Sequence, residues 1–333
     1  MLELEQDVLP KLEQEISPRR ARLDYLEFKE SHFPGMRGKL LRFEGAPGRH
    51  IYNTTVPFDY QGRKILAGRV EGPDGKDSCV MFFEQSGDSW KLVPESACIP
   101  ELEDPFFTAV NGKYILGGVH AIWNESGQLV TYHTDFYYLA ALDRLIWFAQ
   151  GPERMKDIRL LQMPDKRIAV FSRPQGSWME KSGRVAAIGF GLLRSIDELT
   201  SDRIADLPLF KWHFTPDEWG GYNQLFALKN GLIGCIGHKS WGERKNGVHV
   251  IHYYCAANAV NPDTRQMTPM KIIASRDCFP KSAQKEPRTY DVCFTSGIIR
   301  KGGKAELYAG LSDACEGVLE IDDPLREYES LSL

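Results

Sequence analysis

Residues 111–120 read NGKYILGGVH, a tight-turn dipeptide followed by a short apolar strand, and this unit decides the fold because it recurs. The further copies are QGRKILAGRVE (61–71), PDKRIAVFSRP (164–174), NGLIGCIGHK (230–239) and GGKAELYAGLSD (302–313). Their turns lie near positions 62, 112, 166, 231 and 303, so the spacings are 50, 54, 65 and 72 residues. Another apolar segment precedes most copies, so each unit is a hairpin with additional strands.

Hairpin units of this length are typical of the blades of a β-propeller. The absence of long amphipathic patterns between them disfavours βαβ units. We therefore predict an all-β, five-bladed β-propeller, a single domain over residues 1–333 with its core at about 40–320. A β-sandwich with recurring NG-type turns is the alternative that the same pattern allows. Apolar positions within residues 2–16 predict a short N-terminal helical segment, which Pro10 interrupts.

The composition narrows the class of protein. The 333 residues are 42% hydrophobic and 26% charged, with a net charge of −4, which does not favour a nucleic-acid partner. No apolar run approaches the roughly 18 residues that span a membrane, and the acidic N-terminus predicts no signal peptide. Seven widely spread cysteines without a CxxC pair argue against a zinc ribbon and a disulfide framework. We expect a cytoplasmic location, and the oligomeric state stays open.

Polar residues recur at matching phases of the five units. A propeller brings the ends of its inner strands to one mouth, where residues far apart in sequence meet. The residues at these phases are Asn53, Arg69, Glu103, Asp104, Lys156, Asp157, Arg173, His238, Asp291 and Asp313. Each also has an ordinary structural explanation, since Asp before Pro starts turns, exposed ion pairs are common and a histidine can be satisfied in a core. The recurrence favours a functional site.

These segments resemble glycoside hydrolase family 130, the mannoside phosphorylases and their relatives. Glu103-Asp104-Pro105-Phe106 is similar to the family's Glu-Asp-Pro-Arg element, and residues 52–71 to its opening Asn…Arg-Val-Glu hairpin. Residues 155–174 resemble its Lys-Asp-x-x-Leu…Arg element, and residues 219–239 its Gly-rich segment and strand ending in His. The last unit resembles its Val-x-Phe-x-x-Gly…Tyr-x-Gly-x-x-Asp ending. The match covers about residues 40 to 315 and fits a branch of the furanosidase-like five-bladed propellers.

The resemblance implies an inverting glycoside phosphorylase or hydrolase, and the expected substrate is a β-mannoside whose glycosidic bond is cleaved. Asp104 would be the general acid, its pKa raised by the neighbouring charge of Glu103. The phosphate-binding residues would be Lys156, Arg173 and His238. The substrate-binding residues would be Asn53, Arg69, Asp157, Trp219, Tyr222, Asp291, Tyr308 and Asp313, with the aromatic rings stacking on sugar faces. A small oligosaccharide or glycoside is the expected partner. No cofactor is expected beyond inorganic phosphate as co-substrate, and no metal, because no cluster has metal-ligand spacing.

Two departures from the family motifs leave other functions open. Phe106 stands where the family has Arg, and Ser172 where it usually has His, so the cationic cluster is thinner than in the phosphorylases. In hydrolase relatives glutamates activate water, and Glu153 and Glu218 are the candidates for that role here. A catalytically inactive sugar-binding propeller is the alternative function. A purely structural interaction propeller is a third, and it predicts that the three cationic residues scatter over the surface.

Overall fold

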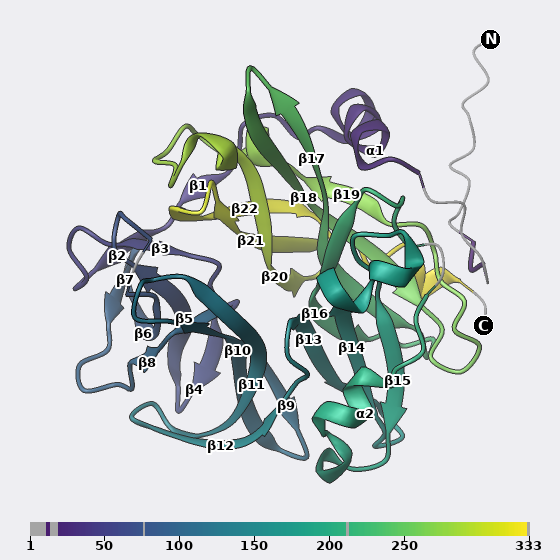
Figure 1. Ribbon diagram of the computed structural model, residues 1–333, viewed down its shortest axis with the longest axis horizontal. Helices are drawn as coiled ribbons and strands as arrows, with labels where there is room; N and C mark the ends of the chain where they lie inside the picture. The colour runs from purple at the N-terminus through teal and green to yellow at the C-terminus, as the bar shows by residue number, and fades with distance from the viewer. Residues whose placement is uncertain (1–10, 14–18, 76, 211–212, 332–333) are drawn as a thin grey trace.

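The structure, a computed structural model, describes residues 11–13, 19–75, 77–210 and 213–331. The chain is mostly β-structure, with hydrogen-bonded sheets that follow one another round the molecule in chain order (Figure 1). This architecture confirms the predicted all-β, propeller-like fold and excludes a set of βαβ units. No helix among the described residues is long and apolar enough to cross a membrane.

The first two sheets contain the first eleven of the strands after β1. The first sheet consists of β2 (Arg42–Glu44), β3 (His50–Tyr52), β4 (Phe58–Tyr60), β5 (Arg63–Glu71), β6 (Cys79–Ser86), β7 (Ser89–Leu92) and β8 (Ile99–Pro100). The second consists of β9 (Leu102–Val110), β10 (Lys113–Trp123), β11 (Leu129–Ala141) and β12 (Arg144–Gln150). Asn111 and Gly112 between β9 and β10 both have positive φ, of 52° and 71°, as the predicted tight turn requires.

The remaining strands form a small sheet and a large one. The small sheet consists of β13 (Met155–Gln162), β14 (Ile168–Pro174) and β15 (Gly189–Leu193). The large one consists of β16 (Trp219–Ala227), β17 (Ile233–Lys245), β18 (Val248–Val260), β19 (Lys271–Ala274), β20 (Asp291–Lys301), β21 (Lys304–Leu311), β22 (Cys315–Asp322) and β1 (Lys39–Leu40). Within it, a short parallel pairing of His252 and Tyr253 with the start of β20 joins two antiparallel meanders. All five repeated sequence units therefore contain the predicted hairpin strand: β5, β10, β14, β17 and β21.

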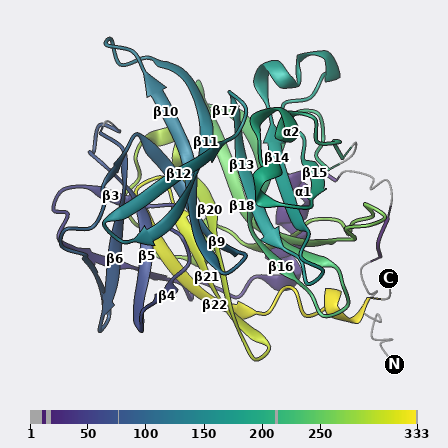
Figure 2. The ribbon, with the colours of Figure 1, turned by 90° about the horizontal axis from the view of Figure 1, so that it is seen from below.

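The innermost strands close a ring. β9 contacts β5 and β13, β13 contacts β16, β16 contacts β20, and β3 contacts β21 and β22. β1 also pairs with β22, so a strand near the N-terminus completes the last meander. Figures 1 and 2 agree that β20–β22 lie between β3–β6 and β16–β18. Ring closure leaves the inner strands side by side at the centre, which is how distant polar residues can meet.

Apolar side chains fill the space between neighbouring sheets. One cluster joins Phe82 of the first sheet to Leu116 of the second, and another joins Ile115 of the second to Ile158 of the third. Further clusters join the third sheet to β16–β18, and these strands to β20–β22. Burial of these faces supplies the main driving force that holds the sheets together.

Helical structure is sparse and lies outside the ring. α1 (Ala21–Glu27) continues into a π-helical turn, η1 (Phe28–His32), and packs beside β17 and β19. The other helical segments are α2 (Ser201–Ala205) and the 3₁₀ turns η2 (Gly176–Trp178), η3 (Glu180–Ser182), η4 (Ile196–Glu198), η5 (Arg276–Cys278), η6 (Pro287–Thr289) and η7 (Tyr328–Ser330). The predicted helix over residues 2–16 lies mostly outside the described residues. Within it, Glu13 forms a β-bridge with Met267, so the short N-terminal helix that is observed begins later than predicted.

Candidate active site

Four of the innermost strands each carry an irregularity in their pairing. The register of β9, β13, β16 and β20 with its neighbour shifts once, at a β-bulge. Asn53, which follows β3, and Asp104 and Asp157, which lie in two of the bulges, have φ of 47°, 47° and 53°. Asn and Asp tolerate this left-handed conformation better than other non-glycine residues, and such residues often mark functional sites. The bulges turn these side chains out of the regular strand pattern.

Asp104 lies in a buried polar network with residues from the first sheet. Asn53 Nδ2 donates a hydrogen bond of 2.7 Å to Asp104 Oδ1, and Arg69 Nη1 lies 3.3 Å from the same oxygen. Arg69 Nη2 also contacts Glu103 Oε1 at 2.9 Å, so one guanidinium holds both neighbouring carboxylates. Asn53 and Asp104 are 5% and 8% exposed, which places the acid at the edge of solvent access.

A second set of contacts, made through Glu71, holds Arg69 in place. Arg69 Nη2 lies 3.1 Å from Glu71 Oε2, and the other oxygen of Glu71 accepts a 2.7 Å hydrogen bond from the Tyr52 hydroxyl. Lys285 Nζ contacts Glu71 Oε1 at 2.6 Å. Glu71 is fully buried, and the two cations around it compensate for its loss of hydration. Arg69 is therefore held in place, and its orientation toward Asp104 is fixed before any ligand binds.

The charge state of the Glu103–Asp104 pair differs from the expectation. Burial pushes the pKa of Asp104 upward, but Arg69, Lys156 and the hydrogen bond from Asn53 outweigh burial and hold it below its usual value. Burial raises the pKa of Glu103, against the attraction of Arg69. Asp104 was expected to have a raised pKa, and in the ligand-free protein its pKa is lowered instead, because Arg69, Lys156 and the hydrogen bond from Asn53 outweigh burial.

Asp157 anchors a second cluster on the neighbouring inner strand. Arg173 Nε lies 2.8 Å from Asp157 Oδ2, and His238 Nε2 lies 3.7 Å from the same oxygen. Burial favours the neutral carboxyl, but the surrounding cations, Arg173 foremost, lower the pKa of Asp157 to about 2. Burial lowers the pKa of His238 to about 3, more than Asp157 raises it, so this imidazole is neutral near pH 7. His238 Nδ1 faces Asn223 Oδ1 at 2.9 Å, so Nδ1 carries the proton and Nε2 keeps its lone pair.

Lys156 connects the two clusters electrostatically. Within the part of the chain that the structure describes, its Nζ has no carboxylate within ion-pair distance, and it lies 6.0 Å from the ring centre of Tyr132. Its charge nevertheless lowers the pKa of both Asp104 and Asp157. An ammonium group that is close to two carboxylates but paired with neither is available to an anionic ligand.

Asp313 approaches the first cluster from the last sheet. It has φ of 52°, and burial raises its pKa to about 6, with Asp104 adding to this and Arg69 and Lys285 opposing it. A carboxyl group with this pKa is partly protonated at neutral pH, so it can both donate and accept hydrogen bonds to sugar hydroxyls.

Two glycines permit the close contacts at the site. A Cβ atom at Gly310 of β21 would collide with Asn53 Oδ1, and one at Gly221 of β16 would collide with Asp157 Oδ2. Gly310 is the glycine of the Tyr-x-Gly-x-x-Asp ending seen in the sequence. Its role is to let the neighbouring sheet approach the residue that positions Asp104.

An aromatic wall lies beside His238. Tyr253 stacks on the His238 ring with centroids 5.4 Å apart, and its hydroxyl accepts a 2.8 Å hydrogen bond from Trp219 Nε1. Phe294 contacts the same imidazole at 4.8 Å between centroids. Trp219 thus joins the site through Tyr253, a residue that sequence reasoning did not select.

Three predicted substrate-binding residues lie elsewhere. Tyr222 is 1% exposed in the apolar core, where its hydroxyl lies 3.3 Å from His213 Nε2. Asp291 pairs with His252 at 2.5 Å where β18 and β20 meet. Tyr308 is 7% exposed in β21 and donates to Glu306 at 3.4 Å. No hydrogen bond or ion pair of the described residues joins these three side chains to the cluster around Asp104, and their role in substrate binding stays a prediction.

The two glutamates considered for activating water also lie apart from the clusters. Glu153 is exposed, and its backbone carbonyl accepts a hydrogen bond from Trp178. Glu218 is buried, and its carboxylate accepts a hydrogen bond of 2.5 Å from the backbone N–H of Ala21 at the start of α1. Glu218 therefore anchors the N-terminal helix.

The departures at Phe106 and Ser172 have structural explanations. Phe106 packs in the apolar cluster between the second and third sheets, and the Arg159 guanidinium lies 4.4 Å from its ring centre. Arg159 is 4% exposed and donates to the backbone carbonyls of Asn223 and Ile158. A buried cation, Arg159, is thus present close to Phe106, but it belongs to β13 and not to β9, which carries Phe106. Ser172 is buried beside Gly189.

Several residues of the network were missed in the sequence. Glu71 could have been found from the sequence, because it lies two residues after Arg69 in the same strand and residues two apart point to the same face. The others carry no local signal, since they reach the site from separate strands and loops: Arg159, Asn223, Tyr253 and Lys285.

The comparisons with known proteins agree with the fold. The protein belongs to the DUF1861 family, described as a protein family of unknown function, whose model matches residues 28–327. No curated protein matches the chain significantly. The structure is similar to MPT-4, a mannose phosphorylase from Leishmania mexicana determined with phosphate ion, at 35% identity and a TM-score of 0.85 over 94% of this chain and 95% of that one.

Two further solved structures are informative. MPT-1, a GDP-Man-dependent mannosyltransferase from Leishmania mexicana, is 32% identical, with a TM-score of 0.82 over 92% of this chain and 95% of that one. A β-1,2-mannobiose phosphorylase from Listeria innocua shares the fold, at 14% identity and a TM-score of 0.58 over 83% of this chain and 91% of that one. The resemblance to the mannoside phosphorylases and their relatives is thereby confirmed.

Proposed function

We propose that the protein is a mannoside-processing enzyme that moves a mannosyl residue between inorganic phosphate and a sugar acceptor, with inversion at the anomeric carbon. The observation that carries the proposal is the position of Asp104, held by Asn53 and Arg69 and acted on by the charge of Lys156. Asp157, the residue next to Lys156 in the chain, holds the second cation, Arg173. The similarity to a mannose phosphorylase over nearly the whole chain supports the choice of sugar and of phosphate.

The proposed site lies at the centre of a five-bladed propeller. Each repeated unit supplies one meander, and the fourth and fifth meanders are joined into the large sheet by the short pairing of β18 with β20. The ring of inner-strand contacts supports this blade count. Asn53, Asp104 and Asp157 come from three consecutive units, which is the convergence that such a ring allows.

In the proposed reaction a phosphate oxygen attacks the anomeric carbon, the glycosidic C–O bond breaks, and Asp104 gives its proton to the leaving oxygen. The low pKa of Asp104 in the ligand-free protein means that the acid must gain its proton after binding. A phosphate dianion beside Lys156 offsets that charge, so its arrival raises the pKa of Asp104. Phosphate would then act as the nucleophile, and its binding would also favour the protonated form of Asp104 that the acid role requires.

The surrounding residues would share the binding of phosphate and sugar. Arg173 and Lys156 offer the charge-assisted hydrogen bonds that phosphate oxygens prefer. His238 Nε2 is buried and has no hydrogen-bond partner among the described residues, so it can accept from a hydroxyl group of a ligand. For His238 this means a sugar hydroxyl or the O–H of monoprotonated phosphate. Asp313 offers a further carboxyl to the sugar.

GDP-mannose-dependent mannosyl transfer is the second candidate, because a transferase of that specificity is 32% identical over 92% of the chain. Hydrolysis has less support, since Glu153 and Glu218 lie apart from the site. A sugar-binding protein without activity remains the alternative outside catalysis. A purely structural interaction propeller finds no support in the arrangement of Arg173 and His238, which share one carboxylate.

The proposal is tested by incubating the pure protein with β-mannosides in the presence of phosphate, in its absence, and with GDP-mannose plus mannose in separate reactions. Mannose 1-phosphate formed only with phosphate supports phosphorolysis. Release of GDP with a new mannoside supports the second candidate. Binding of a mannoside in calorimetry without any product supports the inactive alternative and overturns the enzyme proposal.

A further inference from the structure

Two histidines and an aspartate meet on the second sheet, away from the contacts of Asp104. His120 of β10 lies directly opposite His133 of β11 in the strand register, and their rings are 5.4 Å apart. Asp135 is two residues beyond His133, so alternation along the strand places it on the same face. His120 and His133 lie 15 and 2 positions before Asp135 in the sequence, and the β10–β11 hairpin brings the three side chains together.

The three side chains offer converging donor atoms. His120 Nδ1 lies 2.8 Å from Asp135 Oδ2, and His133 Nε2 lies 3.3 Å from Asp135 Oδ1. One donor atom from each residue can be chosen so that all lie within 4.8 Å of one another. The ligand atoms of a tetrahedral zinc ion lie roughly 3.3 Å apart, as its metal–ligand distances of about 2.0–2.1 Å require. Small side-chain movements therefore suffice to admit an ion.

Neighbouring side chains orient these residues through hydrogen bonds and an ion pair, as the residues around metal ligands do in known metal sites. Glu101 Oε2 lies 3.6 Å from His120 Nε2, which leaves Nδ1 as the nitrogen that faces the centre. Tyr137 OH donates to Asp135 Oδ2 at 3.0 Å, and Trp147 Nε1 donates to Oδ1 at 2.9 Å. Carboxylate–histidine contacts and hydrogen bonds to a ligating carboxylate are the usual second layer of metal sites, where they fix tautomer and orientation.

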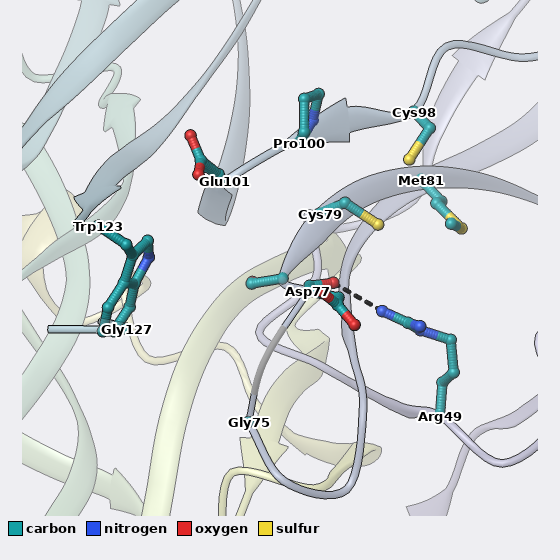
Figure 3. A pocket seen from close by; sticks show the side chains of 11 residues that line it. Arg49, Gly75, Asp77, Cys79, Met81, Cys98, Pro100, Glu101, Trp123 and Gly127 are labelled. Atoms are coloured by element: carbon teal, nitrogen blue, oxygen red, sulfur yellow. Dashed lines mark hydrogen bonds between the residues drawn. The ribbon is translucent and has the colours of Figure 1, made fainter. Parts of the chain in front are cut away.

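An ion can reach this cluster from solvent. The side chain of His120 is 31% exposed and that of His133 is 12% exposed, while Asp135 is only 4% exposed. Glu101 also lines a pocket of about 630 Å³ that runs from the first sheet to Trp123 of β10, as Figure 3 shows. The imidazoles are thus accessible to solvent while the carboxylate of Asp135 is shielded, and the pocket reaches their neighbour Glu101.

We propose that His120, His133 and Asp135 bind a divalent transition-metal ion of the zinc class. Two imidazoles and one carboxylate suit such ions, and three protein ligands leave at least one position for water. The ion would tie β10 to β11 through side chains. This site does not depend on the proposed function, because none of its three residues contacts Asp104, Asp157 or their partners in any hydrogen bond or ion pair of the described residues. The competing explanation is a metal-free network in which both imidazoles donate to Asp135.

The test uses the untagged full-length protein, dialysed against a chelator and then titrated with ZnCl₂ alone by calorimetry. Titration with CoCl₂ adds a spectroscopic readout, because cobalt bound by nitrogen and oxygen ligands absorbs in the visible. The variants are His120→Gln and His133→Gln. His32→Gln is the matched control, since His32 is an exposed histidine far from this sheet in sequence.

We expect one equivalent of zinc to bind with micromolar or tighter affinity, and at least a ten-fold loss in both variants but not in the control. Glu101→Gln, which changes a largely exposed side chain, should weaken binding by about 10–100-fold and keeps the test valid if a histidine variant fails to fold. Absence of saturable binding to the wild type would overturn the proposal, as would equal affinity in the wild type, the histidine variants and Glu101→Gln.

Discussion

The side-chain amide of Asn53 donates a 2.7 Å hydrogen bond to Oδ1 of Asp104, and both residues have the same left-handed φ of 47°. Asn53 follows β3 of the first sheet and Asp104 lies in β9 of the second, 51 positions further along the chain. The unusual backbone of each is what turns its side chain toward the other. We infer that this pair positions the general acid, and the predictions below follow from it and from the cations around it.

The first prediction concerns Gly310, which leaves room for Asn53. Gly310→Ala places a Cβ against Asn53 Oδ1, so Asn53 must move and its hydrogen bond to Asp104 is strained or lost. We expect kcat to fall by about 10-fold or more, since displacing a positioned catalytic group by about 1 Å costs up to about 100-fold. Steady-state kinetics measures this. Gly302→Ala, at a turn, is the control for general effects on folding, and equal kcat in Gly310→Ala and wild type would contradict the role.

The second prediction concerns Lys156 as a phosphate ligand. Lys156→Met keeps the length of the side chain and removes its charge. Loss of one charge-assisted hydrogen bond costs about 1.5–3 kcal/mol, so the KM for phosphate should rise by about 10-fold or more. The KM for the mannoside should change less. Lys64→Met, at an exposed lysine of β5, is the control. An unchanged phosphate KM in the Lys156 variant would exclude this role.

The third prediction concerns the pairing of Phe106 with Arg159. Restoring the arginine of the family motif with Phe106→Arg would place two guanidinium groups together inside the apolar cluster. We expect a loss of about 3 kcal/mol or more in unfolding free energy, whereas Phe106→Leu should lose less. Denaturant unfolding compares the two variants. If Phe106→Arg is as stable as wild type, Arg159 is not the cation that excludes an arginine here.

The fourth prediction concerns Glu316, whose carboxyl group contacts the backbone of Thr54, the residue after Asn53. Its oxygens accept hydrogen bonds from Thr54 N at 3.1 Å and Ser296 Oγ at 2.8 Å, and burial raises its pKa to about 8. The folded state therefore binds this proton more tightly than the unfolded state, whose pKa is near 4.5. Stability from this group is present below pH 4.5 and declines as pH rises toward 8.

Glu316→Gln should remove most of that decline, because the amide resembles the neutral acid at every pH. We expect the variant to melt at a clearly higher temperature than wild type at pH 8, and the difference to shrink at pH 5. Scanning calorimetry at the two pH values measures it. A variant whose melting temperature follows that of the wild type at both pH values would show that Glu316 does not titrate in this range.

The repeated strands could be predicted from the sequence because each begins after a turn that needs Gly, Asn or Asp, a purely local requirement. Asn111-Gly112 is an example. Tyr222 could not be placed in the same way. It precedes a bulge at Asn223, and a one-residue change of register exchanges the two faces of a strand. Sequence alternation alone assigns such a residue to the wrong face.

Side-chain clusters that arise from strand pairing are also invisible in a linear pattern. His120 and Asp135 have no metal-ligand spacing, yet the β10–β11 register brings them to 2.8 Å. The motif-bearing residues Asn53, Arg69 and Asp104 were found because they resemble a known order of segments. Arg159 and Lys285 were missed because nothing local distinguishes them from structural cations. The predicted five-bladed count, single domain and cytoplasmic location stay predictions.

In the proposed reaction Asp104 donates the proton in a phosphate-dependent cleavage of a mannoside. The most direct measurement follows mannose 1-phosphate by ³¹P NMR with wild type and Asp104→Asn at the same folded concentration. We expect product only with phosphate, and a rate at least about 100-fold lower in the variant, because general acid catalysis contributes about 10²–10⁴-fold. Equal rates in the two proteins, or no mannose 1-phosphate from any β-mannoside with wild type, would contradict the proposed reaction.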